Sequence, residues 1–84
     1  MITKNITIQL PTGLEARPVA IFVQVASQFD SSIYVEVGTK RVNAKSIMGM
    51  MTLGLDSGED VVVTAAGDDE EAAIAEIEKY LSAK

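Results

Sequence analysis

The sequence predicts a small α+β domain, in which one antiparallel β-sheet carries its helices on one face. Three observations support this fold class. Apolar residues alternate with polar ones at the start of the chain, which is the period of a half-buried strand. Later segments repeat apolar residues at helical spacing instead. Finally, 48% of the 84 residues are apolar and only 2 are proline, so we expect one folded domain over residues 1–84.

The first strand and the first helix are predicted from a change in apolar period. Apolar residues alternate over residues 2–10, and the strand is expected to end at the Pro-Thr-Gly turn 11–13. Helical spacing then begins after Pro18, which suits the first turn of a helix because its missing N–H is not needed there. We expect this helix at residues 16–27.

A β-hairpin is predicted after this helix. The Asp-Ser-Ser turn at 30–32 precedes residues 33–37, where apolar and polar residues alternate again. The Gly-Thr pair 38–39 fits a two-residue hairpin loop, and a short strand is expected at 40–43.

A short helix is predicted next, with Ser46 as its N-cap. A serine hydroxyl in this position accepts a hydrogen bond from a backbone N–H two or three residues further on. Residues 47–53 supply apolar faces, Gly49 weakens the helix, and Gly54 is expected to stop it.

The last two elements are predicted to be a buried strand and a closing helix. Residues 61–66 form a short, β-branched apolar run, which is typical of a central strand. Asp68 and Glu71 have the spacing of a capping box for a helix whose apolar face runs over 73–81. The expected order is therefore strand, helix, strand, strand, helix, strand, helix.

Composition excludes several kinds of site. The chain contains no cysteine and no histidine, which rules out disulfides, Cys/His zinc sites, iron–sulfur ligation, Ser-His-Asp triads and Cys-His nucleophiles. The net charge of −5 argues against direct binding of nucleic acid. The acidic run 68–71 lacks the spacing of a calcium loop and is interpreted as cap and solubility charge, so we expect no metal and no cofactor.

We also expect no membrane association. The start of the chain alternates at once, without a secretory signal, and no apolar run approaches the ~20 residues that span a bilayer. A cytoplasmic location is the resulting expectation.

The first candidate site is the junction between the first strand and the first helix. A glycine turn leads there into a helix whose first turn carries Glu15 and Arg17. Free N–H groups at a helix start favour anions, and a guanidinium offers planar donors to a carboxylate or a phosphate. The alternative is that Glu15 only complements the helix dipole and Arg17 is an ordinary surface residue.

The second candidate site is the methionine-rich helix that follows Ser46. If Met50 and Leu53 face the core, the other apolar residues form a soft exposed patch of the kind that binds protein partners. The residues of that patch are Ile47, Met48 and Met51. The alternative is an ordinary cap followed by ordinary core residues.

Two segments together resemble the HPr family, the small phosphocarriers of the bacterial sugar phosphotransferase system. They are residues 12–18 (TGLEARP) and residues 42–49 (VNAKSIMG). The resemblance extends over essentially the whole chain. It implies an HPr-like open-faced β-sandwich, βαββαβα, with a four-stranded antiparallel sheet and three helices on one face.

The chain departs from that family at one informative position. The family carries its phosphoryl group on a histidine between Leu14 and Ala16, where this chain has Glu15. A carboxylate lacks the imidazole nitrogen and places negative charge against an incoming anion, so the usual carrier role is expected to be lost. The resemblance then narrows to Crh-like members, which lack the histidine and keep a regulatory serine, here Ser46.

The resemblance implies a regulator that is not an enzyme. In such proteins an HPr kinase/phosphorylase phosphorylates the serine, and the product acts as corepressor for a CcpA-type repressor of the LacI family in carbon catabolite repression. Other proteins of the phosphotransferase system are further implied partners. The sequence leaves the oligomeric state open between a monomer and a weak homodimer, and an exposed first strand could exchange between protomers. The implied partner-binding residues are Arg17, Ala20, Gln24, Ser27, Ile47, Met48 and Met51.

Two alternatives remain open from the sequence. One is a phosphocarrier in which Glu15, natural or engineered, replaces the phosphohistidine. The other is an acyl carrier with Ser57 as its attachment site, because Asp56-Ser57 resembles the attachment dipeptide of that family. The β-branched residues 61–63 argue against an acyl carrier, because they predict a strand, whereas the attachment serine of an acyl carrier begins a long helix in an all-helical fold.

Overall fold

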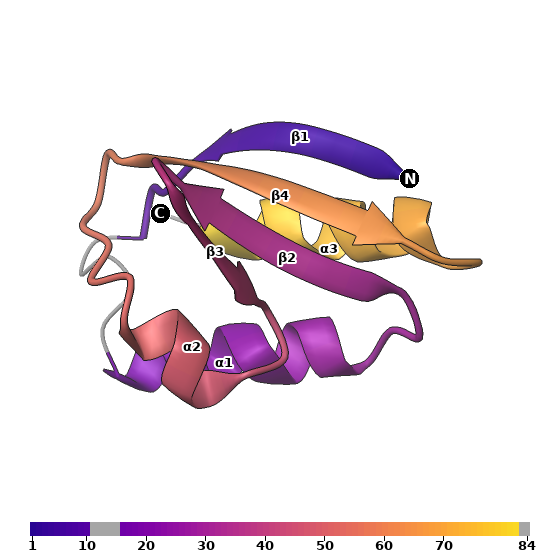
Figure 1. Ribbon diagram of the computed structural model, residues 1–84, viewed down its shortest axis with the longest axis horizontal. Coiled ribbons are helices and arrows are strands. Elements are labelled where there is room, and N and C mark those ends of the chain that lie inside the picture. The colour runs from indigo at the N-terminus through magenta and orange to yellow at the C-terminus, as the bar shows by residue number, and fades with distance from the viewer. Residues whose placement is uncertain (11–15, 83–84) are drawn as a thin grey trace.

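The chain folds as the predicted α+β sandwich, with its elements in the predicted order. The structure is a computed structural model that describes residues 1–10 and 16–82 (Figure 1). Its strands are β1 (Ile2–Thr7), β2 (Ser32–Val37), β3 (Lys40–Asn43) and β4 (Asp60–Ala66). Its helices are α1 (Ala16–Ser27), α2 (Ile47–Met51) and α3 (Glu70–Leu81).

The four strands form one antiparallel sheet in the order β1-β4-β2-β3. β4 is therefore paired on both sides, and its Val63 lies opposite Lys4 of β1 and Val35 of β2. Val61, Val63 and Ala65 are all buried. The prediction of a central strand is confirmed, because β-branched side chains pack well on a sheet that is covered by other elements.

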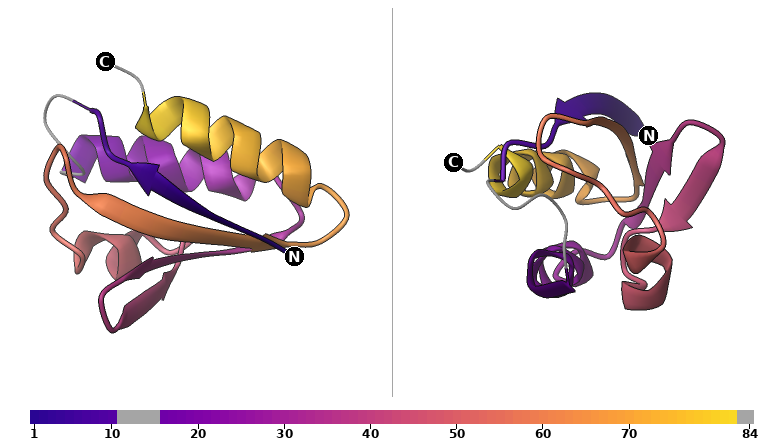
Figure 2. Two further views of the ribbon diagram at one scale, coloured as in Figure 1. Left: turned by 90° about the horizontal axis from the view of Figure 1, so that it is seen from above. Right: turned by 90° about the vertical axis from the view of Figure 1, so that its left-hand side faces the viewer.

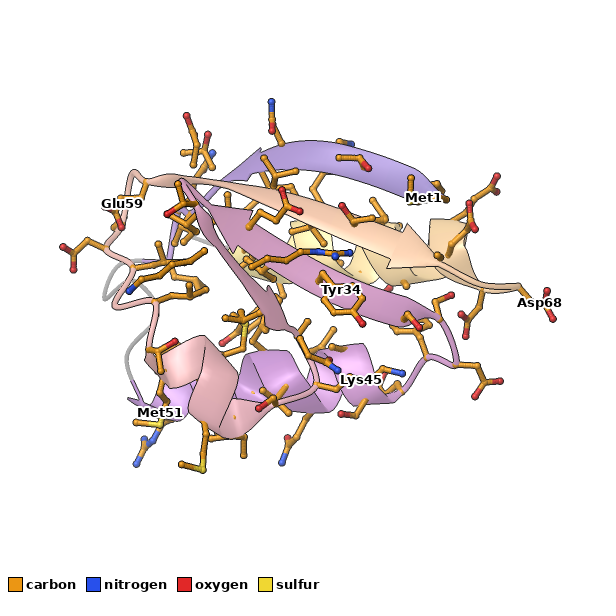
Figure 3. All side chains as sticks on the ribbon, in the orientation of Figure 1. Met1, Tyr34, Lys45, Met51, Glu59 and Asp68 are labelled. Atoms are coloured by element: carbon orange, nitrogen blue, oxygen red, sulfur yellow. The ribbon has the colours of Figure 1, made fainter. Side chains whose placement is uncertain are left out.

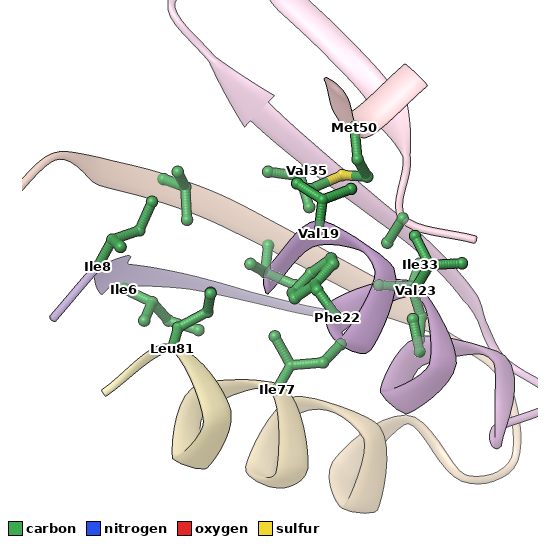
Figure 4. Packing of buried hydrophobic residues seen from close by; sticks show 14 of the residues in the cluster. Ile6, Ile8, Val19, Phe22, Val23, Ile33, Val35, Met50, Ile77 and Leu81 are labelled. Atoms are coloured by element: carbon green, nitrogen blue, oxygen red, sulfur yellow. The ribbon is translucent and has the colours of Figure 1, made fainter. Parts of the chain in front are cut away.

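All three helices cover the same face of the sheet, with α1 between α3 and α2 (Figure 2). The hydrophobic core lies between this helical layer and the sheet. Phe22 of α1 and Ile77 of α3 are fully buried and lie close together there, and Val19 lies between Phe22 and Val35 of β2 (Figure 4). The helices therefore share a single core instead of packing on the sheet independently.

The opposite face of the sheet carries mostly polar side chains. The guanidinium of Arg41 lies on it, 4.1 Å from the centroid of the Tyr34 ring. The Nε atom of Arg41 is also 3.3 Å from Oε1 of Glu36. The neighbouring Val35 and Val42 point toward the helices, so the hairpin divides its side chains between the two faces as the period of a strand requires.

The first strand is shorter than predicted. β1 ends at Thr7, which pairs with Asp60 at the very start of β4. Beyond that pair the chain bonds first to the residues just before β4 and then to the end of α3, and the Ile8 carbonyl accepts from the Gly58 N–H at 2.7 Å. The N–H of Ile8 donates to the Glu59 carbonyl at 2.9 Å, and that of Gln9 donates to the Leu81 carbonyl at 2.8 Å. The alternation of apolar residues continues because Ile8 still points into the core.

The start of α3 also differs from the prediction. The expected capping box between Asp68 and Glu71 is wrong, because the side chain that reaches back is that of Glu70. Its Oε1 atom accepts a hydrogen bond from the Gly67 N–H at 3.2 Å. The helix begins one residue later than a cap at Asp68 would require, and this frees Asp69 for another role.

Asp69 ties the start of α3 to the loop between α1 and β2. Its carboxylate accepts hydrogen bonds from the backbone N–H groups of Asp30 at 2.8 Å and Ser31 at 2.9 Å, and from the Ser31 hydroxyl. The bond with the Ser31 hydroxyl, followed by that with the Asp30 N–H, holds the pKa of Asp69 below its ordinary value of 3.8. The two segments approach so closely that a Cβ at Gly67 would lie 2.7 Å from the Cα of Ser31.

We predict that Asp69→Ala lowers the melting temperature at neutral pH. The folded pKa is the depressed one, so the stabilisation is complete above the ordinary pKa of 3.8 and is lost as the pH falls through the folded pKa. Thermal melts between pH 2 and 7 should therefore converge for wild type and variant at the acid end. Asp68→Ala, at an exposed neighbour, is the matched control and should melt like wild type.

Candidate functional site

Ser46 is the N-cap of α2, as predicted. Its backbone is extended, with φ −107° and ψ 113°, and its Oγ atom accepts a hydrogen bond from the Gly49 N–H at 3.1 Å. The residue is half-buried. Gly49 keeps the neighbourhood open, because a Cβ at that position would lie 3.3 Å from the Ser46 Oγ atom.

A compact turn between β3 and α2 fixes the position of Ser46. The side-chain Oδ1 of Asn43 accepts from the Lys45 N–H at 2.8 Å, and the Asn43 carbonyl accepts from the Ser46 N–H at 3.0 Å. The Nζ atom of Lys45 then donates to the Phe29 carbonyl near the end of α1, at 2.6 Å. The roles of Asn43 and Lys45 were missed from the sequence, although an asparagine two residues before a backbone donor is a known turn signal.

The predicted division of the α2 side chains is confirmed. Met50 is only 1% exposed and lies beside Val19 and Val35 in the core (Figure 4). On the other side of the helix, Met48 is 82% exposed and Met51 is 53% exposed. Ile47 (48% exposed) completes a cluster that we call the α2 patch: Ile47, Met48 and Met51. Met51 lies at the opposite end of the molecule from the acidic turn at Asp68 (Figure 3).

Helix α1 lies between α2 and α3. Its side that faces α3 is identified by two contacts: the Tyr80 hydroxyl donates to the Pro18 carbonyl at 2.9 Å, and Val25 lines a groove with Glu76 and Lys79. Burial raises the pKa of Tyr80, which keeps this hydroxyl protonated as a donor. The predicted contact residues Ala20, Gln24 and Ser27 lie on the flank away from α3.

The predicted contact residues of α1 are accessible to different degrees. Arg17, Gln24 and Ser27 are exposed, whereas Ala20 is half-buried. α1 packs against α2, so these residues and the α2 patch lie on neighbouring helices. The prediction for Glu15 lies outside the described residues, so the site described here is built around Ser46.

The structure removes the acyl-carrier alternative. Ser57 lies in the turn before β4 and not at the start of a helix, and the fold contains a four-stranded sheet. The acyl-carrier hypothesis is therefore wrong. Within residues 1–10 and 16–82, no three acidic side chains approach closely enough to hold a metal ion. None of the helices in this part of the chain is both long and apolar enough to cross a membrane.

Comparison with known proteins gives the class of the chain. A family model described as the PTS HPr component phosphorylation site matches residues 2–83. A crystal structure of HPr-C-His from Thermoanaerobacter tengcongensis superposes with a TM-score of 0.92 at 52% identity, covering 96% of this chain and 91% of that one. These matches extend over nearly the whole sandwich, including both segments that carry the sequence resemblance.

The HPr-like protein Crh of Halalkalibacterium halodurans is 49% identical over 83 residues, covering 94% of this chain and 99% of that protein. A crystal structure of Crh from Bacillus subtilis, described as a swapped dimer, has a TM-score of 0.77 at 43% identity and covers 96% of this chain and 93% of that one. The chain therefore belongs to the HPr family, and within it the chain is Crh-like.

We predict that Ser46→Ala lowers the free energy of unfolding by about 1 kcal/mol, because the Gly49 N–H loses its acceptor. Ser46→Asp should stay within about 0.5 kcal/mol of wild type, since a carboxylate is also a good N-cap acceptor. Urea denaturation measures both, with Ser57→Ala as the exposed control. If Ser46→Asp were as unstable as Ser46→Ala, a negative group at this position would be incompatible with α2.

Proposed function

We propose that the protein is a regulator of carbon catabolite repression that an HPr kinase/phosphorylase modifies on Ser46. The phosphorylated form then binds a CcpA-type repressor of the LacI family as its corepressor. In this proposal the protein is a substrate and a binding partner, and the kinase performs the catalysis. The observation that carries the proposal is a half-buried serine at the start of a helix that also presents the α2 patch.

The chemistry is a phosphoryl transfer from ATP. The Ser46 Oγ atom forms a bond to the γ-phosphorus, the bond to the bridging oxygen of ADP breaks, and the serine proton passes to a base of the kinase. The product gains roughly −1.5 to −2 charges at neutral pH and three strong acceptor oxygens. The Asn43 bonds of the turn do not involve the Ser46 hydroxyl, so they persist after the transfer.

The switch is expected to work through the surface and not through refolding. The phosphate would lie next to the α2 patch, and Met50 keeps α2 attached to the core in either state. A partner that offers an arginine for the phosphate and an apolar pocket for Met48 would recognise the modified form. Arg17 on the neighbouring helix adds a charged contact to this surface.

The replacement of the family's histidine by Glu15 supports a regulator over a carrier. A carboxylate gives phosphoryl transfer no imidazole nitrogen, and an acyl phosphate on Glu15 is the remaining way to a carrier function. Interaction with other phosphotransferase proteins is retained as part of the same alternative.

A weak homodimer is also proposed, because β1 is an edge strand that pairs with β4 alone, and sedimentation velocity over a range of concentrations tests it.

The phosphorylation prediction uses two donors in separate reactions. With ATP and an HPr kinase/phosphorylase, the purified protein should gain one phosphate, and fragmentation mass spectrometry should place it on Ser46. Ser46→Ala should gain none, whereas Ser57→Ala should behave like wild type because that hydroxyl lies in a different turn. With phosphoenolpyruvate and the general phosphotransferase enzyme, no phosphate should appear. Phosphate on Glu15 in that second reaction would favour the carrier alternative.

The docking prediction concerns the α2 patch. Met48→Asp should weaken binding of the phosphorylated protein to the repressor by about tenfold or more, because a buried apolar contact is replaced by an unpaired charge. Its stability should change little, since Met48 is 82% exposed. Asn5→Asp adds the same charge to an exposed position in β1 and is the matched control. Equal affinities for the two variants, measured by calorimetry, would remove the α2 patch from the interface.

A further inference from the structure

Helix α2 presents its three methionines to very different surroundings. Met48 is 82% exposed and Met51 is 53% exposed, whereas Met50 between them is 1% exposed. The helix is short, so these three thioethers share one local sequence and one backbone conformation. They differ almost entirely in their access to solvent.

Solvent access decides whether a methionine reacts with a peroxide. The thioether sulfur attacks one oxygen of hydrogen peroxide, so that an S–O bond forms while the O–O bond breaks. The leaving hydroxide takes up the proton of the transferred hydroxyl and departs as water. The sulfur loses two electrons, the peroxide gains them, and the product is methionine sulfoxide, which thiol-dependent reductases convert back.

We propose that Met48 and Met51 form a peroxide-sensitive modification site that controls docking through the α2 patch. Oxidation replaces two soft apolar contacts with strongly polar sulfoxides on a surface that a partner must desolvate. The selective oxidation of these two methionines depends only on their exposure, whereas its effect on repressor binding rests on the proposed function. The reactant is a small two-electron oxidant, hydrogen peroxide.

The arrangement confines the effect of oxidation to the surface. Met50 is the residue of α2 that reaches the core, where it lies beside Val19 and Val35 (Figure 4). Because its sulfur is shielded, oxidation of its neighbours removes no core contact. The cap is also untouched, since the Oγ atom of Ser46 bonds to a backbone N–H and not to a side chain of the patch. An oxidised protein should therefore stay folded with its phosphoserine in place.

The chain also holds a reference methionine outside the patch. Met1 is 83% exposed, as much as Met48, and belongs to the opposite layer of the molecule. Its oxidation reports the dose of oxidant without touching α2. A docking effect that follows the oxidation of Met48 and Met51, and not that of Met1, belongs to the patch.

The experiment treats the Ser46-phosphorylated protein with graded hydrogen peroxide and measures two quantities. Peptide mass spectrometry follows one added oxygen at each methionine, and calorimetry follows affinity for the repressor. We expect Met48, Met51 and Met1 to be oxidised at least about tenfold faster than Met50. We expect affinity to fall by about tenfold or more as Met48 and Met51 react, and to return after treatment with methionine sulfoxide reductases.

The Met48→Leu, Met51→Leu double variant is the matched control. Whatever its own affinity, peroxide should leave that affinity unchanged even though Met1 still becomes oxidised. Circular dichroism before and after treatment shows whether the fold persists, so that loss of binding through unfolding is recognised and counts against the proposal.

The outcomes separate this inference from the proposed function. Oxidation of Met50 at the rate of Met48 would overturn the selective site, and unchanged affinity of the fully oxidised patch would overturn its control of docking. If the untreated phosphoprotein fails to bind the repressor at all, the proposed function fails, while the mass spectra still decide whether the selective modification site exists.

Discussion

The two-sided pairing of β4 is the constraint on which the rest of the structure depends. β4 lies between β1 and β2, and its inward side chains Val61, Val63 and Ala65 form the floor of the core. All three helices cover this inward face of the sheet. The other face stays open and polar, so an apolar surface patch has to come from the helical layer.

A second constraint places that patch. A helix of five residues does not hold together alone in water, so α2 depends on its contacts with the core and with the turn before it. Burial of Met50 sets the rotation of the helix, and this rotation turns Met48 and Met51 outward. The bond from Lys45 to the Phe29 carbonyl sets its position beside α1. One buried side chain and one turn therefore decide both where Ser46 lies and what surrounds it.

The sequence allowed most of this arrangement to be predicted. The period of apolar residues, the hairpin loop at 38–39 and the capping serine at 46 together located every helix and strand. The spacing of the α2 residues also separated Met50 from the α2 patch, on the condition that Met50 faces the core. The errors fell where tertiary contacts decide. β1 ends early because its partner strand begins only at Asp60. The alternating pattern of residues 8–10 contains no information about where that partner begins. The role of Asp69 escaped detection because its partners, Asp30 and Ser31, are distant in the chain and only the fold brings them together.

The functional predictions likewise include some that the sequence pattern supports and some that it does not. Spacing places Ile47, Met48 and Met51 on one side of α2, and the structure decides that this side is the exposed one. The capping role of Ser46 follows from its residue type and place. Whether Ser46 is modified does not follow from spacing, because an N-cap serine looks the same in a regulated protein and an unregulated one. The family assignment, and the replacement of the family's histidine by Glu15, are therefore the basis on which phosphorylation of Ser46 is proposed.

The placement of the two tyrosines gives the molecule its own optical reporters. The chain has no tryptophan, so tyrosine dominates its near-ultraviolet signal. Tyr34 lies under the Arg41 guanidinium on the open face of the sheet, whereas Tyr80 is half-buried among the helices and bonded to Pro18. Each ring therefore senses a different layer, and replacing either one by phenylalanine isolates the spectrum of the other. Separation of the two layers during unfolding becomes visible without attaching a dye.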